Sequence, residues 1–246
     1  MLHQASQVLL VTGIALSTVS AGIAVGAGPL PAQESKDYSS FFADKDLVGA
    51  GWAACPDPIT WSVDTRGLKA RVARREVRRL EASWSQWSAA SGIVVKFAGS
   101  ERLAFDPSTN GLQSADGSPT PNRHVFVAFK SPSQVPIMTG GAVGLAMPSL
   151  VLLPTREIIG GMVILRRGYV LEQRKIDPDR VKHLYMHEFG HVLGLGHGTS
   201  QGNVMYPAID HLGSLGAGDR AGVQAMTQAC VRPLGSTVVN ITEWRE

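Results

Sequence analysis

Three histidines in the second half of the chain have a spacing that suits one metal ion. His187 and His191 are four residues apart, so they lie on one face of a helix, and Glu188 follows the first of them. His197 comes six residues later, beyond glycines that allow the helix to end and the chain to turn back. Three neutral imidazoles with an open fourth position are typical of a catalytic zinc site, whereas structural sites more often use cysteines.

This segment also resembles a family signature. The pattern His-Glu-x-x-His-x-x-Gly-x-x-His is that of the metzincin metallopeptidases, which carry a methionine turn downstream. Here Asn203–Pro207 reads Asn-Val-Met-Tyr-Pro and resembles that turn in the matrixin branch, the family of the matrix metalloproteinases. Leu215–Asp219 is similar to the matrixin lead-in to the last helix. From Cys55 to Cys230, the chain resembles a bacterial-type secreted matrixin-like metzincin zinc metallopeptidase.

The resemblance implies an α+β fold of the metzincin type. Its parts are a twisted mixed five-stranded sheet with an antiparallel edge strand, a long basic helix, an active-site helix and a C-terminal helix. Met205 would form a floor beneath the ligands, and Tyr206 and Pro207 would belong to the turn and pocket wall. An extended substrate would pair antiparallel with the edge strand, at the positions Ala142, Val143, Gly144, Leu145 and Ala146. The alternative is an ordinary sheet strand whose edge the neighbouring loop covers.

These residues predict hydrolysis of peptide bonds in a protein or peptide substrate. Zinc held by His187, His191 and His197 would lower the pKa of its bound water. Glu188 would accept the water's proton as general base and later pass it to the leaving amine. The alternative is a catalytically weak zinc-containing extracellular binding module, against which the presence of Glu188 argues.

The match to animal matrixins is incomplete, because their cysteine-switch motif Pro-Arg-Cys-Gly is absent. They also hold a second, structural zinc upstream of the active helix. After the leader, the only upstream histidines here are His124 and His183, too few for that site. We therefore expect one catalytic zinc ion. Calcium stays open as a further ion, because loop carbonyls and carboxylates such as Asp106 and Asp116 could supply oxygen ligands.

Hydrophobic periodicity predicts the elements that must position this site. Strands are expected at 59–64, 93–98, 124–129, 141–147 and 158–169, and a basic helix at 68–90. A polar loop is expected at 99–123. The active helix should begin at Asp177 as N-cap, with Pro178 as its first residue, and run to about Leu193.

The chain divides by composition into four parts. Residues 1–27 are apolar and uncharged from Val8 on, and predict a signal peptide or an uncleaved membrane anchor. Residues 28–54 read as a linker or short pro-segment, 55–232 as the catalytic domain and 233–246 as a tail of unknown role. The net charge of +3 does not require a nucleic-acid partner, and we expect none. We expect a secreted monomer that touches a membrane only if the leader is uncleaved.

The two cysteines agree with export. Cys55 begins the predicted catalytic domain and Cys230 ends it, so a disulfide would join its two ends. The alternative is that Cys55 blocks the zinc as a switch. It lacks the Arg-Cys-Gly context and directly precedes a predicted strand, which favours the disulfide.

Overall fold

The computed structural model describes residues 37–42, 46–138, 141–230 and 237–241. All of them belong to one compact unit, Lys36–Glu246. The predicted signal peptide or anchor, residues 1–27, lies outside the described residues. Among the residues that are described, no helix has the length and apolar character needed to cross a membrane.

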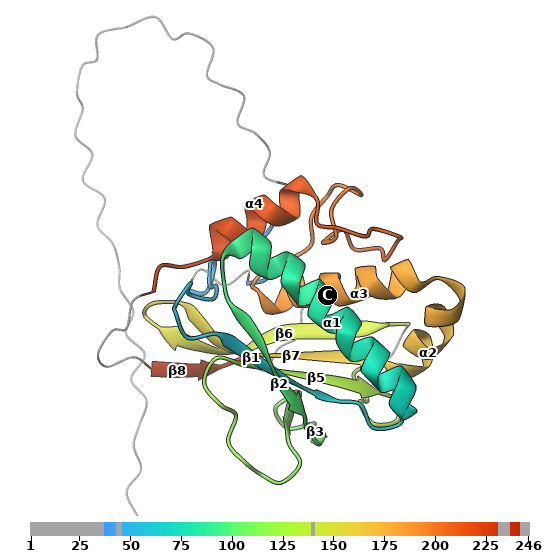
Figure 1. Ribbon diagram of the computed structural model, residues 1–246. Coiled ribbons are helices and arrows are strands. Elements are labelled where there is room, and N and C mark those ends of the chain that lie inside the picture. The colour runs from blue at the N-terminus through green and yellow to red at the C-terminus, as the bar shows by residue number, and fades with distance from the viewer. Residues whose placement is uncertain (1–36, 43–45, 139–140, 231–236, 242–246) are drawn as a thin grey trace, which may run out of the picture. The chain divides into compact units, whose positions relative to one another are not determined.

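The described strands form one large sheet and one hairpin (Figure 1). They are β1 (Ile59–Asp64), β2 (Val95–Ser100), β3 (Leu103–Asp106), β4 (Gly111–Ser114), β5 (His124–Lys130), β6 (Gly144–Leu153), β7 (Glu157–Arg166) and β8 (Thr237–Asn240). The large sheet has six strands in the order β2-β1-β5-β7-β6-β8, and β3 pairs with β4. The first four of these run parallel, β6 is antiparallel to β7, and β8 is antiparallel to β6. This mixed sheet confirms the predicted α+β fold class.

The described helices are α1 (Ala70–Ser91), α2 (Arg167–Ile176), α3 (Pro178–Val192) and α4 (Ala217–Met226). Helices α1, α2 and α3 contact this sheet, and α4 packs against α1 (Figure 1). One stripe of α1 is apolar, and it buries Leu80, Trp84 and Trp87. Trp84 stacks on Phe189 of α3 with 3.9 Å between ring centroids. Trp87 donates a hydrogen bond from Nε1 to the carbonyl of Met186 at 2.9 Å. The large aromatic side chains of α1 therefore hold α3 in place.

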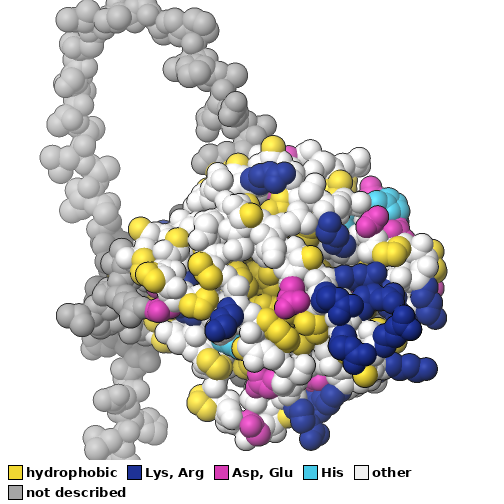
Figure 2. Space-filling model, in the orientation of Figure 1, with side chains coloured by type: hydrophobic (Ala, Val, Ile, Leu, Met, Phe, Trp, Pro, Cys, Tyr) yellow, Lys and Arg dark blue, Asp and Glu magenta, His cyan; other side chains and the backbone are white. Residues whose placement is uncertain are grey.

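The opposite face of α1, the helix that the sequence predicted to be basic, is exposed. Arg71, Arg74, Arg75 and Arg78 are all exposed. Figure 2 shows Lys and Arg side chains gathered over one part of the molecular surface. Glu76, in contrast, is buried and pairs with Arg79 at 2.9 Å.

Three elements differ from the sequence-based expectation. The predicted polar loop at 99–123 contains the hairpin β3–β4, whose strands have four residues each. The predicted strand at 158–169 ends at Arg166, and helix α2 follows directly. The tail contributes β8, which makes the sheet one strand wider than predicted.

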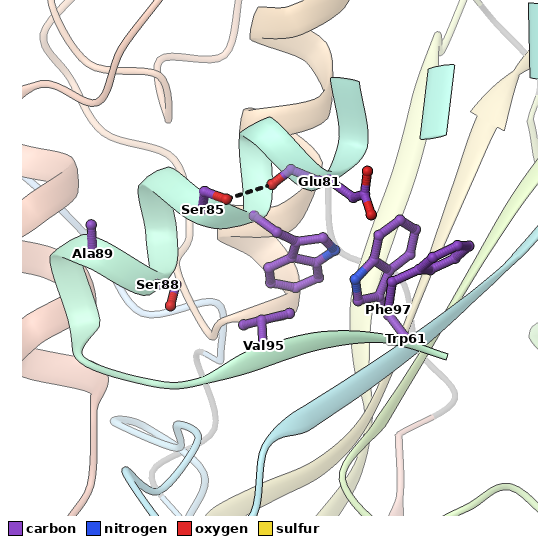
Figure 3. Close-up of a pocket in the computed structure, with 8 residues that line it drawn as sticks. Trp61, Glu81, Ser85, Ser88, Ala89, Val95 and Phe97 are labelled. Atoms are coloured by element: carbon purple, nitrogen blue, oxygen red, sulfur yellow. Dashed lines mark hydrogen bonds between the residues drawn. The ribbon is translucent and has the colours of Figure 1, made fainter. Parts of the chain in front are cut away.

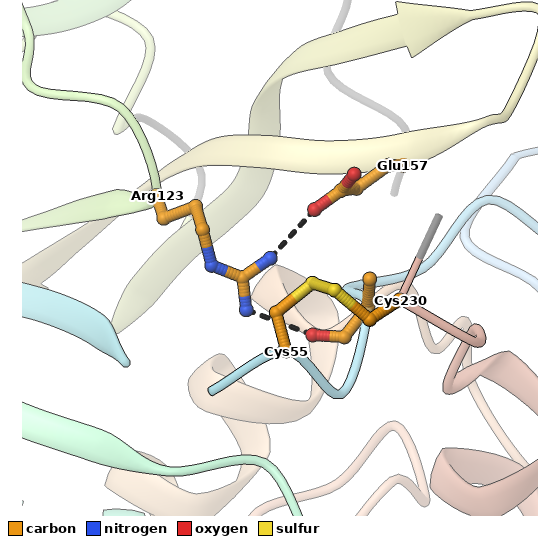
Figure 4. Close-up of a disulfide and its surroundings, with 5 residues drawn as sticks. Cys55, Arg123, Glu157 and Cys230 are labelled. Carbon is orange, nitrogen blue, oxygen red and sulfur yellow. Dashed lines mark hydrogen bonds and ion pairs between the residues drawn. A yellow bond between two sulfur atoms is a disulfide. The ribbon is translucent and has the colours of Figure 1, made fainter. Parts of the chain in front are cut away.

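The predicted disulfide between Cys55 and Cys230 is confirmed, with 4.9 Å between the Cα atoms. It closes a loop of 175 residues, which in the chain-entropy description stabilises the fold by about 5 kcal/mol. Figure 4 shows Arg123 beside it, where its guanidinium pairs with Glu157 at 2.6 Å. The same guanidinium donates to the carbonyl of Ala53 at 2.8 Å. The beginning and end of the domain are thus joined at one point.

Residues before Cys55 also pack on the domain, which the sequence did not predict. Phe41, Phe42, Ala50 and Trp52 are buried in the hydrophobic core. Trp52 donates from Nε1 to the carbonyl of Val192, at the end of α3, at 2.8 Å. The described part of the segment 28–54 is therefore in direct contact with the active-site helix. Its assignment as a linker or short pro-segment stays a prediction.

Candidate active site

Helix α3 begins and ends as the sequence predicts. The Asp177 side chain caps it by accepting a hydrogen bond from a backbone N–H of the first turn, and Pro178 is its first residue. The helix ends at Val192, and Gly194 then takes a φ of 97°, in the left-handed region that glycine tolerates. This turn directs the chain back, so that His197 comes to lie beside the two histidines of the helix.

The three predicted ligands converge on one point. Ligand nitrogens of His187, His191 and His197 all lie within 4.8 Å of one another. The Nδ1 atom of His187 lies 2.7 Å from the carbonyl oxygen of Val204, and that of His191 lies 2.8 Å from the carbonyl of Leu195. A ring that donates from Nδ1 to a carbonyl keeps its lone pair on Nε2. The Nε2 atoms of His187 and His191 are 3.1 Å apart and so face a common centre.

Burial keeps these imidazoles neutral. It lowers the pKa of His191 to about 4 and that of His197 below its usual range. Burial also lowers the pKa of His187 well below its usual range, and the neighbouring His191 adds to this effect. Neutral imidazoles are the form that binds a metal, and three of them suit zinc with a fourth position left open. In the part of the chain that is described, no other histidine, cysteine or carboxylate cluster brings three ligand atoms so close.

Glu188 lies between α3 and the sheet. Its side chain is buried, and burial raises the pKa of its carboxyl group to about 8. The carboxylate packs against the backbone of Gly144 in β6, where an added Cβ would overlap Oε1. A zinc ion at the nearby histidines would favour the ionised carboxylate and lower this pKa again. Glu188 is therefore held in one place, next to both the ligands and β6.

Met205 lies beneath the active-site helix. It is buried, and a Cβ at Gly190 of α3 would overlap its sulfur, so only a glycine lets the two approach this closely. The buried Asp219 of α4 holds the turn. Its carboxylate accepts hydrogen bonds from the backbone N–H groups of Val204 at 2.7 Å and Met205 at 3.0 Å. The sequence placed Asp219 before the last helix but gave no sign of this contact.

Comparison with known proteins agrees with this geometry. A family model described as Matrixin matches residues 160–227, from within β7 to just beyond α4. The matched segment holds the three histidines, Glu188 and the methionine turn. The matched segment is matrixin-like. Together with the histidine triad, it supports a metzincin-type zinc metalloendopeptidase. No curated protein matches the chain.

In this matrixin-like domain, one carbonyl serves two histidines. The carbonyl of Val204 lies 2.7 Å from Nδ1 of His187 and 3.1 Å from Nε2 of His183. The other ring nitrogen of His183 accepts a hydrogen bond from the backbone N–H of Asp210 at 3.0 Å. His183 must therefore carry its proton on Nε2 and donate it to Val204. It is a buried support of the methionine turn, and its two nitrogens are both occupied.

The loop that carries His197 is bound by the residues before the catalytic domain. Ser39 donates from Oγ to the carbonyl of His197 at 2.8 Å. The Asp37 carboxylate accepts from the backbone N–H groups of Thr199 and Ser200, each at 3.0 Å. Burial acts to raise the pKa of Asp37, but these hydrogen bonds outweigh it and lower the pKa. This contact was missed, since nothing periodic in residues 37–42 signals it.

The predicted substrate positions lie where β6 begins. Gly144, Leu145 and Ala146 are the first residues of β6, whereas Ala142 and Val143 precede it. Tyr206 is half-buried and Pro207 is exposed, directly after Met205 in the chain. Their role in substrate binding stays a prediction.

The two candidate calcium ligands lie in turns far along the chain from the histidines. The Asp106 carboxylate accepts a hydrogen bond from the backbone N–H of Ser108, and that of Asp116 from Ser118, each at 2.9 Å. These local bonds account for the lowered pKa of both groups. Calcium binding stays a prediction.

A separate hollow of about 400 Å³ lies between α1 and the strands β1 and β2 (Figure 3). Trp61 and Phe97 form one wall, with 4.4 Å between ring centroids, and Glu81 and Val95 line it from the helix and from β2. None of its lining residues belongs to α3 or to the histidine triad. It is therefore distinct from the candidate active site.

Proposed function

We propose that this chain is an exported zinc endopeptidase that cleaves an extended segment of a protein or peptide. The observation that carries the proposal is the position of Glu188. Its buried carboxylate lies beside the histidine triad and against Gly144 at the start of β6. A peptide paired with β6 would therefore be presented to both the metal centre and the base.

Zinc held by the three histidines would acidify a coordinated water and polarise the scissile carbonyl. Glu188 would accept the water's proton on a carboxylate oxygen and return it to the nitrogen of the leaving amine. Its burial supports this role, because a low-dielectric setting raises the affinity of a carboxylate for a proton. Its contact with Gly144 keeps the carboxylate from turning away from the reacting bond.

Substrate would bind by pairing antiparallel with the outer edge of β6. Gly144 and Ala146 have small side chains or none, so a peptide backbone can approach this part of the strand. Tyr206 and Pro207 would line the wall of the pocket for the side chain after the scissile bond. Sequence preference would then depend on the loop from Met205 to Leu215.

Export is supported by two independent features. The apolar, uncharged residues 8–28 suit a leader, and the disulfide joining Cys55 to Cys230 suits an oxidising compartment. The domain holds its ligands, base and methionine turn in a single chain. We therefore propose a monomer that contacts a membrane only if the leader is retained.

The decisive experiment is Glu188→Gln, with Glu81→Gln on the exposed face of α1 as the matched control. Profiling a peptide library would first supply a cleaved sequence. The Glu188 variant should keep one zinc ion per chain, and its hydrolysis should fall by about 10²–10⁴-fold, the usual contribution of a general base. The control should keep full activity.

Hydrolysis that persists in the Glu188 variant at the wild-type rate would sink the proposed mechanism. If the zinc-loaded wild type cleaves no peptide of the library, the chain is a zinc-containing binding module instead.

A further inference from the structure

The outer edge of β6 is only partly covered. β7 pairs with β6 along its inner edge, from Gly144 to Leu152. On the other side, β8 pairs with the segment Leu150–Leu153, and the N–H of Ile241 donates to the carbonyl of Ser149 at 2.9 Å. In the part of the chain that the structure describes, no strand pairs with the outer edge of Gly144–Pro148. The outer edge of β6 therefore has a covered half, Ser149–Leu153, and an open half, Gly144–Pro148.

The open half is the one that faces the active site. Gly144, at the beginning of β6, packs against Glu188, whereas Leu150–Leu153 form its far end. Pro148 is about 13 Å from Gly144 along the strand, at roughly 3.3 Å per residue. The covered half thus begins about five residues away from the catalytic base.

β8 also has the direction of a bound substrate. It is antiparallel to β6, with Thr237 opposite Leu153 and Asn240 opposite Leu150. A substrate antiparallel to β6 has its residues before the scissile bond on the side of Leu150. β8 therefore occupies the position that the N-terminal part of a long substrate would take.

We propose that β8 is a specificity element, an internal strand that limits how many residues before the scissile bond can pair with β6. Short substrates pair with Gly144–Pro148 alone, and longer ones must displace β8 to extend the ladder. This proposal rests on the proposed function of β6 as the substrate-binding strand. It adds the preference for length and the element that sets it.

How strongly β8 competes with a substrate for β6 depends on how it is held to the sheet and to the rest of the chain. The strand has only four residues, so few backbone hydrogen bonds hold it to β6. It follows Cys230 by seven residues, and the disulfide to Cys55 fixes Cys230 to the domain. A short tether gives a local concentration in the millimolar range. A weakly paired strand can therefore compete with a substrate in solution and still be displaced.

The test compares the full chain with two variants. One ends at Leu234, which removes β8 but keeps the disulfide. The other is Val239→Pro. Ile241 donates its N–H to β6 and donors alternate along a strand, so the N–H of Val239 also faces β6 and proline removes it from the ladder. Its matched control is Val239→Thr, which keeps the backbone donor and a β-branched side chain. The substrates are peptides with one cleavage sequence, lengthened stepwise either before or after the scissile bond, and kcat and KM are measured separately.

In the full chain and in the Val239→Thr control, kcat/KM should stop rising once the peptide is long enough to reach Leu150. In the truncated and proline variants it should keep rising, by about two- to tenfold for each further paired residue, through a lower KM. Lengthening after the scissile bond should affect all four proteins equally. Thermal unfolding checks that both variants are folded. If the truncated chain does not fold, the length profile of the proline variant is the test.

The same length profile in all folded proteins would overturn the proposal, and would leave β8 as a strand that only protects the sheet edge. This failure differs from that of the proposed function. Cleavage of short peptides that depends on Glu188 would still support the endopeptidase, whatever the length profile shows.

Discussion

Replacing Asp219 with alanine should weaken both the fold and the metal site. Its buried carboxylate accepts three backbone hydrogen bonds, from Val204 at 2.7 Å, Met205 at 3.0 Å and Gly216 at 2.7 Å. A buried donor left without a partner costs about 1–3 kcal/mol. Because neighbouring losses are not additive, we expect a total of about 3–5 kcal/mol. In a domain of this size that lowers Tm by roughly 10 °C.

Zinc affinity should fall as well, and this effect is separate from the loss of folding stability. Asp219 holds Val204, whose carbonyl accepts from Nδ1 of His187. Removing a group that orients a metal ligand in this way costs about 10–100-fold in affinity. The assay is competition against a chelator of known affinity, with thermal unfolding measured separately on zinc-free protein. Asp179→Ala is the matched control, an exposed carboxylate in the first turn of α3.

The control should change stability by at most about 1 kcal/mol and leave zinc affinity intact. If Asp219→Ala lowers Tm while zinc affinity stays at the wild-type value, the coupling through Val204 is refuted. If neither quantity changes, the three hydrogen bonds do not hold the turn.

Two further outcomes follow from buried carboxylates. Gly144→Ala should displace Glu188 by about an ångström and lower kcat by about 10²-fold, with zinc retained. The control is Gly168→Ala, whose added methyl group meets no neighbour and which should keep wild-type kcat. Equal kcat values for the two variants would refute the contact between Gly144 and Glu188. Burial acts to raise the pKa of Asp64, but hydrogen bonds from Arg66 and Lys130 lower it far below 3.8. The stability that Asp64 contributes is therefore complete above about pH 4 and lost as pH falls toward the folded-state pKa. Urea unfolding at a series of pH values should show that the free energy of unfolding falls less steeply toward acid pH in Asp64→Asn than in the wild type. Parallel plots of unfolding free energy against pH for the two proteins would contradict this.

Local patterns predicted the elements that position the site. The strand at Ile59–Asp64 has the predicted bounds, because its alternation is bounded by a turn. The start of α3 follows from Asp177 and Pro178, whose capping effects need no tertiary contact. Where the pattern is weaker, the prediction failed. The hairpin β3–β4 lies in a stretch that reads as polar loop, and α2 continues an apolar run that reads as strand.

The tail shows the same limit. Residues 237–241 carry an alternating pattern that is compatible with a strand, but four residues pair with a sheet only if an edge is open to them. That edge belongs to β6, more than eighty residues earlier. No local signal could have connected the two.

For the site itself, the sequence alone determined the residue types and their order. The spacing of His187 and His191 on a helix, the glycines before His197 and the neighbouring Glu188 specify three ligands and a base through helix periodicity and backbone freedom. The tertiary structure decided what these groups can do. Val204 selects the ligand nitrogen of His187, burial keeps the imidazoles neutral, and Gly144 brings the base to β6. These effects depend on contacts between residues far apart in the chain, so they exist only once the sheet and helices have packed.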